Sequence, residues 1–236
     1  MIQTDPNTQN YLVATLKPWN IEAFTQFTPE LPGQWHLITE KNQLTTDYLN
    51  SLDPRYIFFP HWSWIVPEDI LKHWECVCFH MADVPYGRGG SPLQNLIARG
   101  HKETRLSALQ MVKELDAGPV YRKLPLSLEG SAQEIFERMA PKIYQLICYI
   151  VEQTPQPKPQ EGEVTLFKRR TPEQSELPKT ADLKALYDHI RMLDAQSYPK
   201  AYIDWGDYRM EFTDANQDDP DQLFASVFIT KRPNKS

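Results

Sequence analysis

A histidine and an aspartate carry the strongest chemical signal in this chain. His80 ends the apolar run Cys76–His80 and precedes the glycine-dense loop Gly87–Gly90. A neutral imidazole can accept a proton at pH 7, and α/β proteins bind ligands where strands end. Asp116 is a carboxylate that could orient this imidazole, although a core histidine and a turn-capping aspartate are the plainer interpretations. We predict a proton-transfer site built from His80 and Asp116.

Two further side chains near His80 could take part in the chemistry. Cys78 should share a face with His80, because side chains alternate along a strand. Its thiol could be a weak donor to a developing oxyanion, a nucleophile activated by His80, or a small apolar filler. Arg88 could bind a phosphate or carboxylate, or hold its own loop in place. Substrate contacts are predicted at Tyr86, Arg88, Gly89 and Gly90.

Composition excludes several classes of function. The 236 residues carry a formal net charge of -6, which provides no basic stripe, so we expect no nucleic-acid partner. No apolar run reaches the roughly 18 residues that cross a bilayer, and Met1–Asn10 is polar, so a cytoplasmic protein with no membrane partner is expected. Three cysteines without metal-ligand spacing indicate neither a disulfide framework nor a metal site.

Strands and helices are expected to alternate along the first two thirds of the chain. This alternation predicts an α/β fold, with a Rossmann-like, mostly parallel sheet and helices on both faces. Ser131 and Glu134 form a capping box before a long amphipathic helix that contains Pro141. Strands are expected at Tyr11–Thr15, Trp35–Thr39, Tyr56–Phe59 and Cys76–His80, and shorter helices at Ile21–Phe27, Pro67–Lys72 and Ser91–Ala98.

The segment Thr154–Glu163 is rich in Pro, Gln and Glu and is typical of an exposed linker. It separates a predicted catalytic domain, residues 1–155, from a small C-terminal α+β domain, residues 164–236. The second domain should hold a β-hairpin around Gly206-Asp207, whose edge could support a homodimer. Its elements are expected at Val164–Phe167, Ala181–Leu193, Ala201–Trp205, Tyr208–Phe212 and Ala225–Thr230.

An ordered set of motifs around the two candidate residues is specific. His80 is followed by Pro85, Arg88-Gly89 and Pro92, and later by Leu115-Asp116-Ala117-Gly118. This set resembles the formyltransferases that use N10-formyltetrahydrofolate as co-substrate. The resemblance implies that His80 is the general base and that Asp116 orients it. It also favours a strand for the ambiguous run Leu106–Leu115. The pterin would be flanked by Trp62, Ser63, Trp64, Ile65, Val66, Glu114, Leu115 and Asp116.

Among these formyltransferases, the chain looks most like the sugar N-formyltransferases. Its short C-terminal domain and modest acidity disfavour transfer RNA as acceptor. The resemblance implies formylation of the amino group of a nucleotide-linked deoxyamino sugar, in surface polysaccharide biosynthesis. The family has a catalytic asparagine where this chain has Cys78. Two alternatives stay open: a Cys78-His80-Asp116 acyltransferase or hydrolase, and a non-catalytic folate- or sugar-binding relative.

Overall fold

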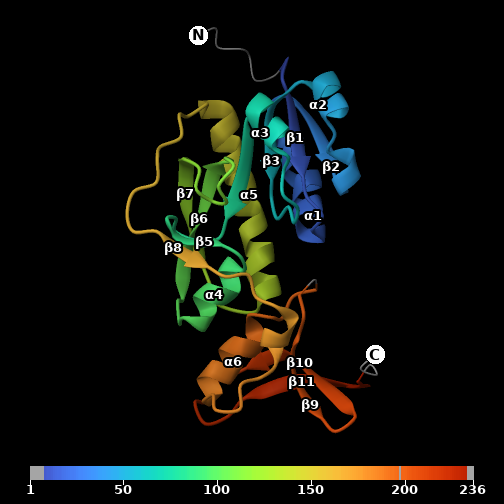
Figure 1. Cartoon of the computed structure of the whole chain (residues 1–236), viewed down its shortest axis with the longest axis vertical. Coiled ribbons are helices and arrows are strands. Elements are labelled where there is room, and N and C mark those ends of the chain that lie inside the picture. The colour runs from blue at the N-terminus through green and yellow to red at the C-terminus, as the bar shows by residue number, and fades with distance from the viewer. Residues whose placement is uncertain (1–7, 197, 233–236) are drawn as a thin grey trace. The chain divides into compact units, whose positions relative to one another are not determined.

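The computed structural model describes residues 8–196 and 198–232 (Figure 1). Its contacts divide the chain into two compact units, each made of several segments. Of the described residues, the first unit contains 8–88, 105–126 and 137–166, and the second contains 89–104, 127–136, 167–196 and 198–232. The expectation about Met1–Asn10 falls largely outside the described residues. No helix in the described part of the chain is long and apolar enough to cross a membrane.

A six-stranded sheet forms the centre of the first unit. Its order is β2-β1-β3-β4-β6-β7, and the strands from β2 to β4 are mutually parallel, whereas β6 runs antiparallel to β4. Leu12, Ile57 and Val77 are fully buried, as expected for strands covered on both faces. The Rossmann-like fold class is therefore confirmed. The strands are β1 (Asn10–Ala14), β2 (Gln34–Ile38), β3 (Pro54–Phe59), β4 (Cys76–His80), β6 (Glu103–Gln110) and β7 (Val120–Ser127).

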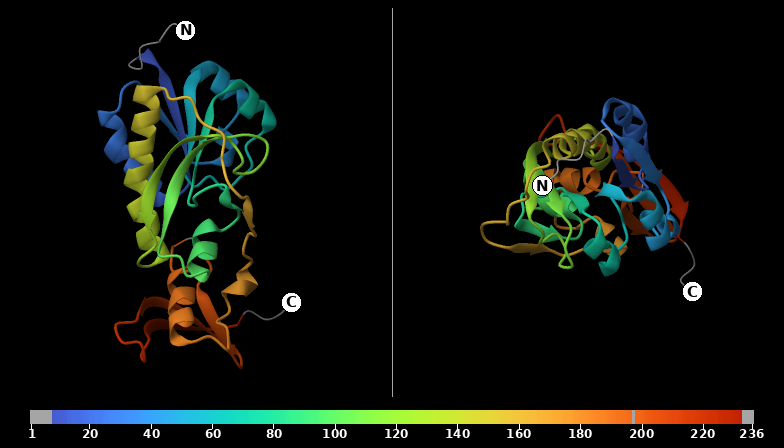
Figure 2. Two further views of the ribbon diagram at one scale, coloured as in Figure 1. Left: turned by 90° about the vertical axis from the view of Figure 1, so that its left-hand side faces the viewer. Right: turned by 90° about the horizontal axis from the view of Figure 1, so that it is seen from above.

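The longest helix, α5 (Ala132–Gln153), begins at the predicted capping box. The Ser131 backbone N–H donates to Glu134 Oε2 at 2.7 Å, and the Glu134 N–H donates to Ser131 Oγ at 3.2 Å. The helix continues through Pro141. Within the first unit it runs beside the sheet (Figure 2), where Ile143, Leu146 and Ile150 are buried. The shorter helices are α1 (Pro18–Phe27), α2 (Thr46–Leu52) and α3 (Glu68–His73).

Four elements differ from the sequence-based expectation. The strand expected at Leu106–Leu115 is β6 and ends at Gln110, because residues 111–119 turn back. The helix α2 and the strand β7 were not expected. The glycine-dense loop after His80 contains a short strand, β5 (Tyr86–Gly89), which pairs with β8 (Thr165–Phe167). A four-residue strand with two glycines has no alternating pattern that would reveal it.

The second unit contains an antiparallel sheet in the order β11-β10-β9. The predicted hairpin is present, and Gly206 takes the positive φ of 57° that its turn requires. The helix α6 packs against β10 (Figure 2), and the buried Arg191 bonds Asp188 Oδ1 at 2.7 Å. The elements are α4 (Pro92–Ala98), α6 (Leu183–Arg191), β9 (Ala201–Trp205), β10 (Tyr208–Asn216) and β11 (Phe224–Lys231). Single 3-10 turns lie at Thr28–Glu30 and Lys41–Gln43 in the first unit and at Pro172–Ser175 in the second unit.

Candidate active site

His80 lies at the end of β4 with 7% of its surface exposed, and both of its ring nitrogens have neighbours. The Nε2 atom is 2.7 Å from the Gly87 carbonyl oxygen, which can only accept a hydrogen bond. Nε2 therefore carries the proton of the neutral ring, and the lone pair lies on Nδ1. The Nδ1 atom is 3.5 Å from Asp116 Oδ2. The structure thus brings His80 and Asp116 together, with the carboxylate facing the basic nitrogen.

Asp116 reaches His80 through a turn that folds back along the sheet. Because β6 is antiparallel to β4, Gln110 lies beside Val77, three residues before His80. The chain reverses after Gln110, and Asp116 adopts a left-handed φ of 54°. A Cβ on Gly118 would lie 1.7 Å from the Gln110 carbonyl oxygen, so this position requires glycine. The glycine that follows the aspartate in the motif is thus explained by the close return of the chain.

Gln160 is a residue of this site that the sequence analysis missed. Its Nε2 donates to the carbonyl oxygens of Asp116 at 2.8 Å and Gly118 at 2.7 Å. Its Oε1 accepts from Arg88 Nε at 3.0 Å. Gln160 lies 44 positions after Asp116, within the segment expected to be an exposed linker. No local pattern distinguishes it from the other polar residues of that segment.

Cys78 packs against the apolar core cluster of the first unit, as Met111 and Trp62 also do. Burial raises the pKa of the Cys78 thiol far above its ordinary value, and the negative charge of Asp116 raises it further. The thiol is therefore protonated at neutral pH, which disfavours the nucleophile among the three roles considered. A weak S–H donor and an apolar filler both fit the geometry.

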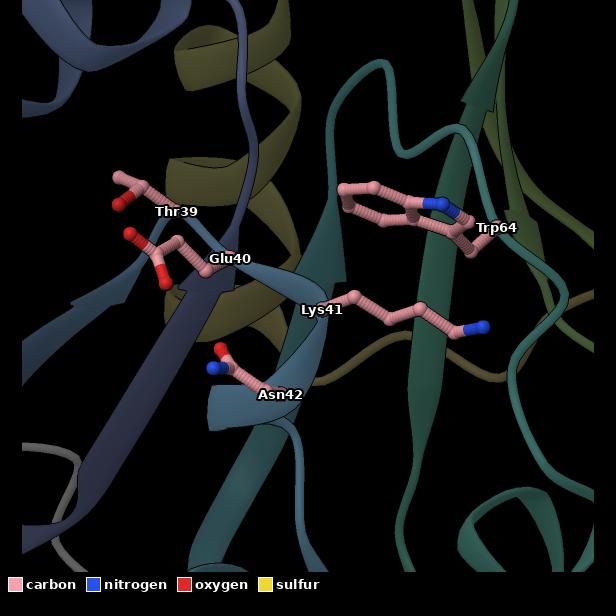
Figure 3. A pocket seen from close by; sticks show the side chains of 5 residues that line it. All are labelled: Thr39, Glu40, Lys41, Asn42 and Trp64. Carbon is pink, nitrogen blue, oxygen red and sulfur yellow. The ribbon is translucent and has the colours of Figure 1, made fainter.

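The loop after β3 carries most of the predicted folate contacts. Val66 is buried, whereas Ser63, Trp64 and Ile65 are exposed, Ile65 at 92%. Trp62 and Trp64 meet edge-on with ring centroids 4.9 Å apart. Trp64 lines an open pocket of about 580 Å³ with residues 39–42, and the Lys41 side chain extends below its ring (Figure 3). Exposed aromatic and aliphatic groups of this kind suit a flat heteroaromatic ligand.

The second predicted folate segment is also exposed. Leu115 has 70% of its surface in solvent, and Glu114 is exposed beside it. Lys113 Nζ lies 3.4 Å from Glu68 Oε2, which links this turn to the start of α3. The segments 62–66 and 114–116 therefore belong to neighbouring parts of the same unit. Within the described residues, no group of three or more His, Cys, Asp or Glu side chains could hold a metal ion.

The predicted substrate contacts lie along β5 and its continuation. Tyr86 and Arg88 are partly exposed in the first unit. In the second unit, a Cβ on Gly89 would lie 2.4 Å from the Phe167 carbonyl oxygen, and one on Gly90 would lie 2.5 Å from Arg169 Cα. Close chain packing is therefore sufficient to explain these two glycines. Their predicted contact with substrate remains a prediction.

His61 is a second buried imidazole, in the loop after β3. Its Nδ1 faces Asn20 Nδ2 at 3.1 Å and accepts from Trp19 Nε1 at 3.4 Å. Burial, followed by the positive charge of Lys17, lowers the pKa of His61 to about 3. The ring is therefore neutral at physiological pH and acts as a fixed hydrogen-bond acceptor between α1 and the loop after β3.

Comparisons with known proteins place this site in a family. The model "Methionyl-tRNA formyltransferase, C-terminal domain" matches residues 172–230. The solved structure "Methionyl-tRNA formyltransferase from Clostridium thermocellum" is 44% identical, with a TM-score of 0.92, covering 95% of this chain and all of that one. The chain therefore belongs to the formyltransferase family that includes methionyl-tRNA formyltransferase.

Curated relatives carry the same name. The Rickettsia bellii protein is 25% identical over 202 residues, which are 82% of this chain and 66% of that protein. The Bacillus thuringiensis protein is 28% identical over 199 residues, which are 80% and 62% of the two chains. The chain thus spans slightly less than two thirds of the length of these relatives. The family's formyl donor, N10-formyltetrahydrofolate, agrees with the predicted co-substrate.

The predicted acceptor is wrong. The likeness to a solved sugar N-formyltransferase, that from Shewanella sp FDAARGOS_354, shows the fold alone, because the two chains are 13% identical, with a TM-score of 0.65. The nucleotide-linked amino sugar and the role in surface polysaccharide biosynthesis conflict with the methionyl-tRNA formyltransferase relatives. The expectation of no nucleic-acid partner fails for the same reason. Net charge averages over the whole surface, whereas contact with RNA requires only a local group of cations.

Proposed function

We propose that this protein transfers the formyl group of N10-formyltetrahydrofolate to the amino group of methionyl-tRNA. The Clostridium thermocellum relative carries the choice of acceptor, because its 44% identity extends over all of that chain. The juxtaposition of His80 and Asp116 supports the chemistry, since aminolysis of a formamide requires proton removal from the attacking amine.

In the proposed reaction, the neutral methionyl amine attacks the formyl carbon and forms a new C–N bond. His80 accepts the proton that the amine releases, at Nδ1, because the Gly87 carbonyl already engages Nε2–H. The Asp116 carboxylate, 3.5 Å from Nδ1, stabilises the imidazolium that results. The bond from the formyl carbon to N10 then breaks, and the proton returns from His80 to the departing nitrogen. Charge and atoms balance without a further reactant.

The formyl oxygen gains negative charge during this reaction. Cys78 stands two residues before His80 on the same face of β4 and is a weak donor for that oxygen. The loops 62–66 and 114–116 are the proposed folate contacts. Arg88 is the proposed contact for the acceptor. The domains predicted at residues 1–155 and 164–236, and the homodimer, remain predictions.

The direct test supplies the full chain with the formyl donor and tRNA charged with labelled methionine. We expect formylmethionyl-tRNA to form, and the same tRNA carrying another amino acid to react more slowly. His80→Ala should lower kcat by at least about 10²-fold, the usual contribution of a general base. His73→Ala, at an exposed histidine of α3, is the matched control and should retain full activity. Absence of formylation, or full activity of His80→Ala, would refute the proposal.

A further inference from the structure

The segment between α5 and β8 is attached to the candidate site, although most of it is exposed. Lys158 exchanges two backbone hydrogen bonds with Val120, at 2.8 and 2.7 Å. This bridge lies two residues before Gln160 and four residues after Asp116. It therefore brings the Gln160 side chain next to the turn that carries the catalytic carboxylate.

The Gln160 amide uses its donor and acceptor sides for two different partners. Both hydrogen bonds from Nε2 end on carbonyl oxygens, those of Asp116 and Gly118. The partner of Oε1 is Arg88 Nε–H, which can only donate. The chemistry of the three partners thus fixes the orientation of the amide. One side chain joins the aspartate turn to the arginine of β5.

Each partner has a reason to need such a connection. Asp116 lies in the left-handed region, which is sterically unfavourable for a residue other than glycine. The turn also contains a long bond from the Ala117 N–H to the Glu114 carbonyl oxygen at 3.3 Å and is closed by a bond from the Gln110 N–H to the Pro119 carbonyl oxygen at 2.9 Å. The hydrogen bond to Gln160 uses only the Nε–H of Arg88 and does not involve the two terminal nitrogens of the guanidinium. These two nitrogens form the fork that binds phosphates and carboxylates.

We propose that Gln160 is a positioning residue that holds the Asp116 carboxylate against His80 and, at the same time, holds the Arg88 guanidinium ready for the acceptor. This role rests on the proposed function of the site. Gln160 itself touches no reacting atom. It acts through the backbone of residues 116–118 and through the side chain of Arg88, so its two effects are separable by substitution.

The test compares two substitutions at Gln160 that break different bonds. Gln160→Met removes the donors and the acceptor at similar size. Gln160→Glu keeps an acceptor for Arg88 Nε but replaces both donors with an oxygen that faces two carbonyls. We expect Gln160→Met to lower kcat and to raise the KM for methionyl-tRNA, each by about tenfold, because small misplacements of catalytic groups are costly. Gln160→Glu should lower kcat similarly and leave that KM within about twofold of wild type.

Gln156 provides the matched control, because it is an exposed glutamine of the same segment. Gln156→Met and Gln156→Glu should leave both constants unchanged. Equal kcat in wild type and both Gln160 variants would overturn the proposal, as would a Gln160→Glu enzyme whose KM rises as much as that of Gln160→Met.

A second readout separates this role from the proposed function. If the wild-type protein formylates no methionyl-tRNA, the proposed function is wrong, but the effect of Gln160 on the turn at residues 116–118 can still be measured by hydrogen exchange. We expect the Ala117 amide to exchange about tenfold faster in Gln160→Met than in wild type, at an unchanged melting temperature. An unchanged exchange rate at Ala117 would overturn the proposed positioning role of Gln160, whatever the activity.

Discussion

At the scale of single residues, the site depends on which nitrogen of His80 is basic. Sequence reasoning assigned Asp116 the task of orienting the ring. In the structure, the Gly87 carbonyl fixes the tautomer through Nε2–H, and Asp116 faces the other nitrogen. The role of the Gly87 carbonyl could not be predicted, because every residue has a backbone carbonyl and its residue type does not reveal a hydrogen bond to it. The pairing of His80 with Asp116 could be predicted, because ionisable side chains are visible in the sequence.

The state of Cys78 distinguishes formyl transfer from covalent catalysis. We expect Cys78→Ala to lower kcat by less than about tenfold, because a thiol is only a weak hydrogen-bond donor. Its raised pKa makes a thiolate mechanism unfavourable at neutral pH. Steady-state formylation assays measure this, with thermal melting as a check on the packing. Complete loss of activity in both Cys78→Ala and Cys78→Ser, with a covalent adduct on wild-type Cys78, would support the acyltransferase instead.

His61 makes the stability of the fold sensitive to acid. Its pKa in the folded protein is about 3, below the usual value near 6.5 in an unfolded chain. Unfolding therefore takes up a proton between these values, and stability falls as pH decreases through this window. Between pH 8 and pH 5 the contribution of His61 to the free energy of unfolding falls by about 2 kcal/mol. His61→Asn, which tolerates the positive φ at this position, should flatten this part of the profile in urea melts. Parallel profiles for the two proteins would contradict this assignment.

At the scale of elements, long periodic segments and the parallel core were predictable from the sequence. The helix after Ser131 and the strand Cys76–His80 follow from the capping box and from apolar runs. The end of β6 and the existence of β5 did not follow, because both depend on distant partners. Gly118 must fit against Gln110, and β5 needs β8. The attachment of Gln160 is non-local in the same way.

The capping box makes a separable contribution to the stability of α5. Ser131→Ala removes the acceptor for the Glu134 N–H, and we expect a loss of about 1 kcal/mol in the free energy of unfolding. Ser226→Ala, at an exposed position of β11, serves as control and should change stability little. Thermal or urea melts measure both. An unchanged stability in Ser131→Ala would show that the cap is not needed.

At the scale of the whole molecule, net charge misled the choice of acceptor. The chain is acidic, with a net charge of -6, yet its second unit gathers exposed cations at Arg99, Lys168 and Arg169. Asn95 joins them, since its Nδ2 donates to the Lys168 carbonyl at 3.0 Å and its own carbonyl accepts from Arg99 at 2.9 Å. A local group of this kind can meet RNA phosphates on an acidic protein.

This group provides a test of RNA contact that is independent of the chemistry. We expect Lys168→Glu combined with Arg169→Glu to raise the KM for methionyl-tRNA about tenfold or more, with kcat unchanged. The salt dependence of tRNA binding should weaken by the equivalent of about two phosphate contacts. Lys179→Glu combined with Lys231→Glu changes the net charge equally at exposed positions of the same unit. Equal effects of the two pairs would mean that only total charge matters.

The most direct test of the central claim is the single-turnover rate of formyl transfer to methionyl-tRNA by wild type and Asp116→Asn. The substitution keeps the size of the side chain and removes the charge that faces His80 Nδ1. A fall of about 10²-fold or more at saturating substrates, with little change in binding, is the predicted result. Transfer by Asp116→Asn at the wild-type rate would contradict the account.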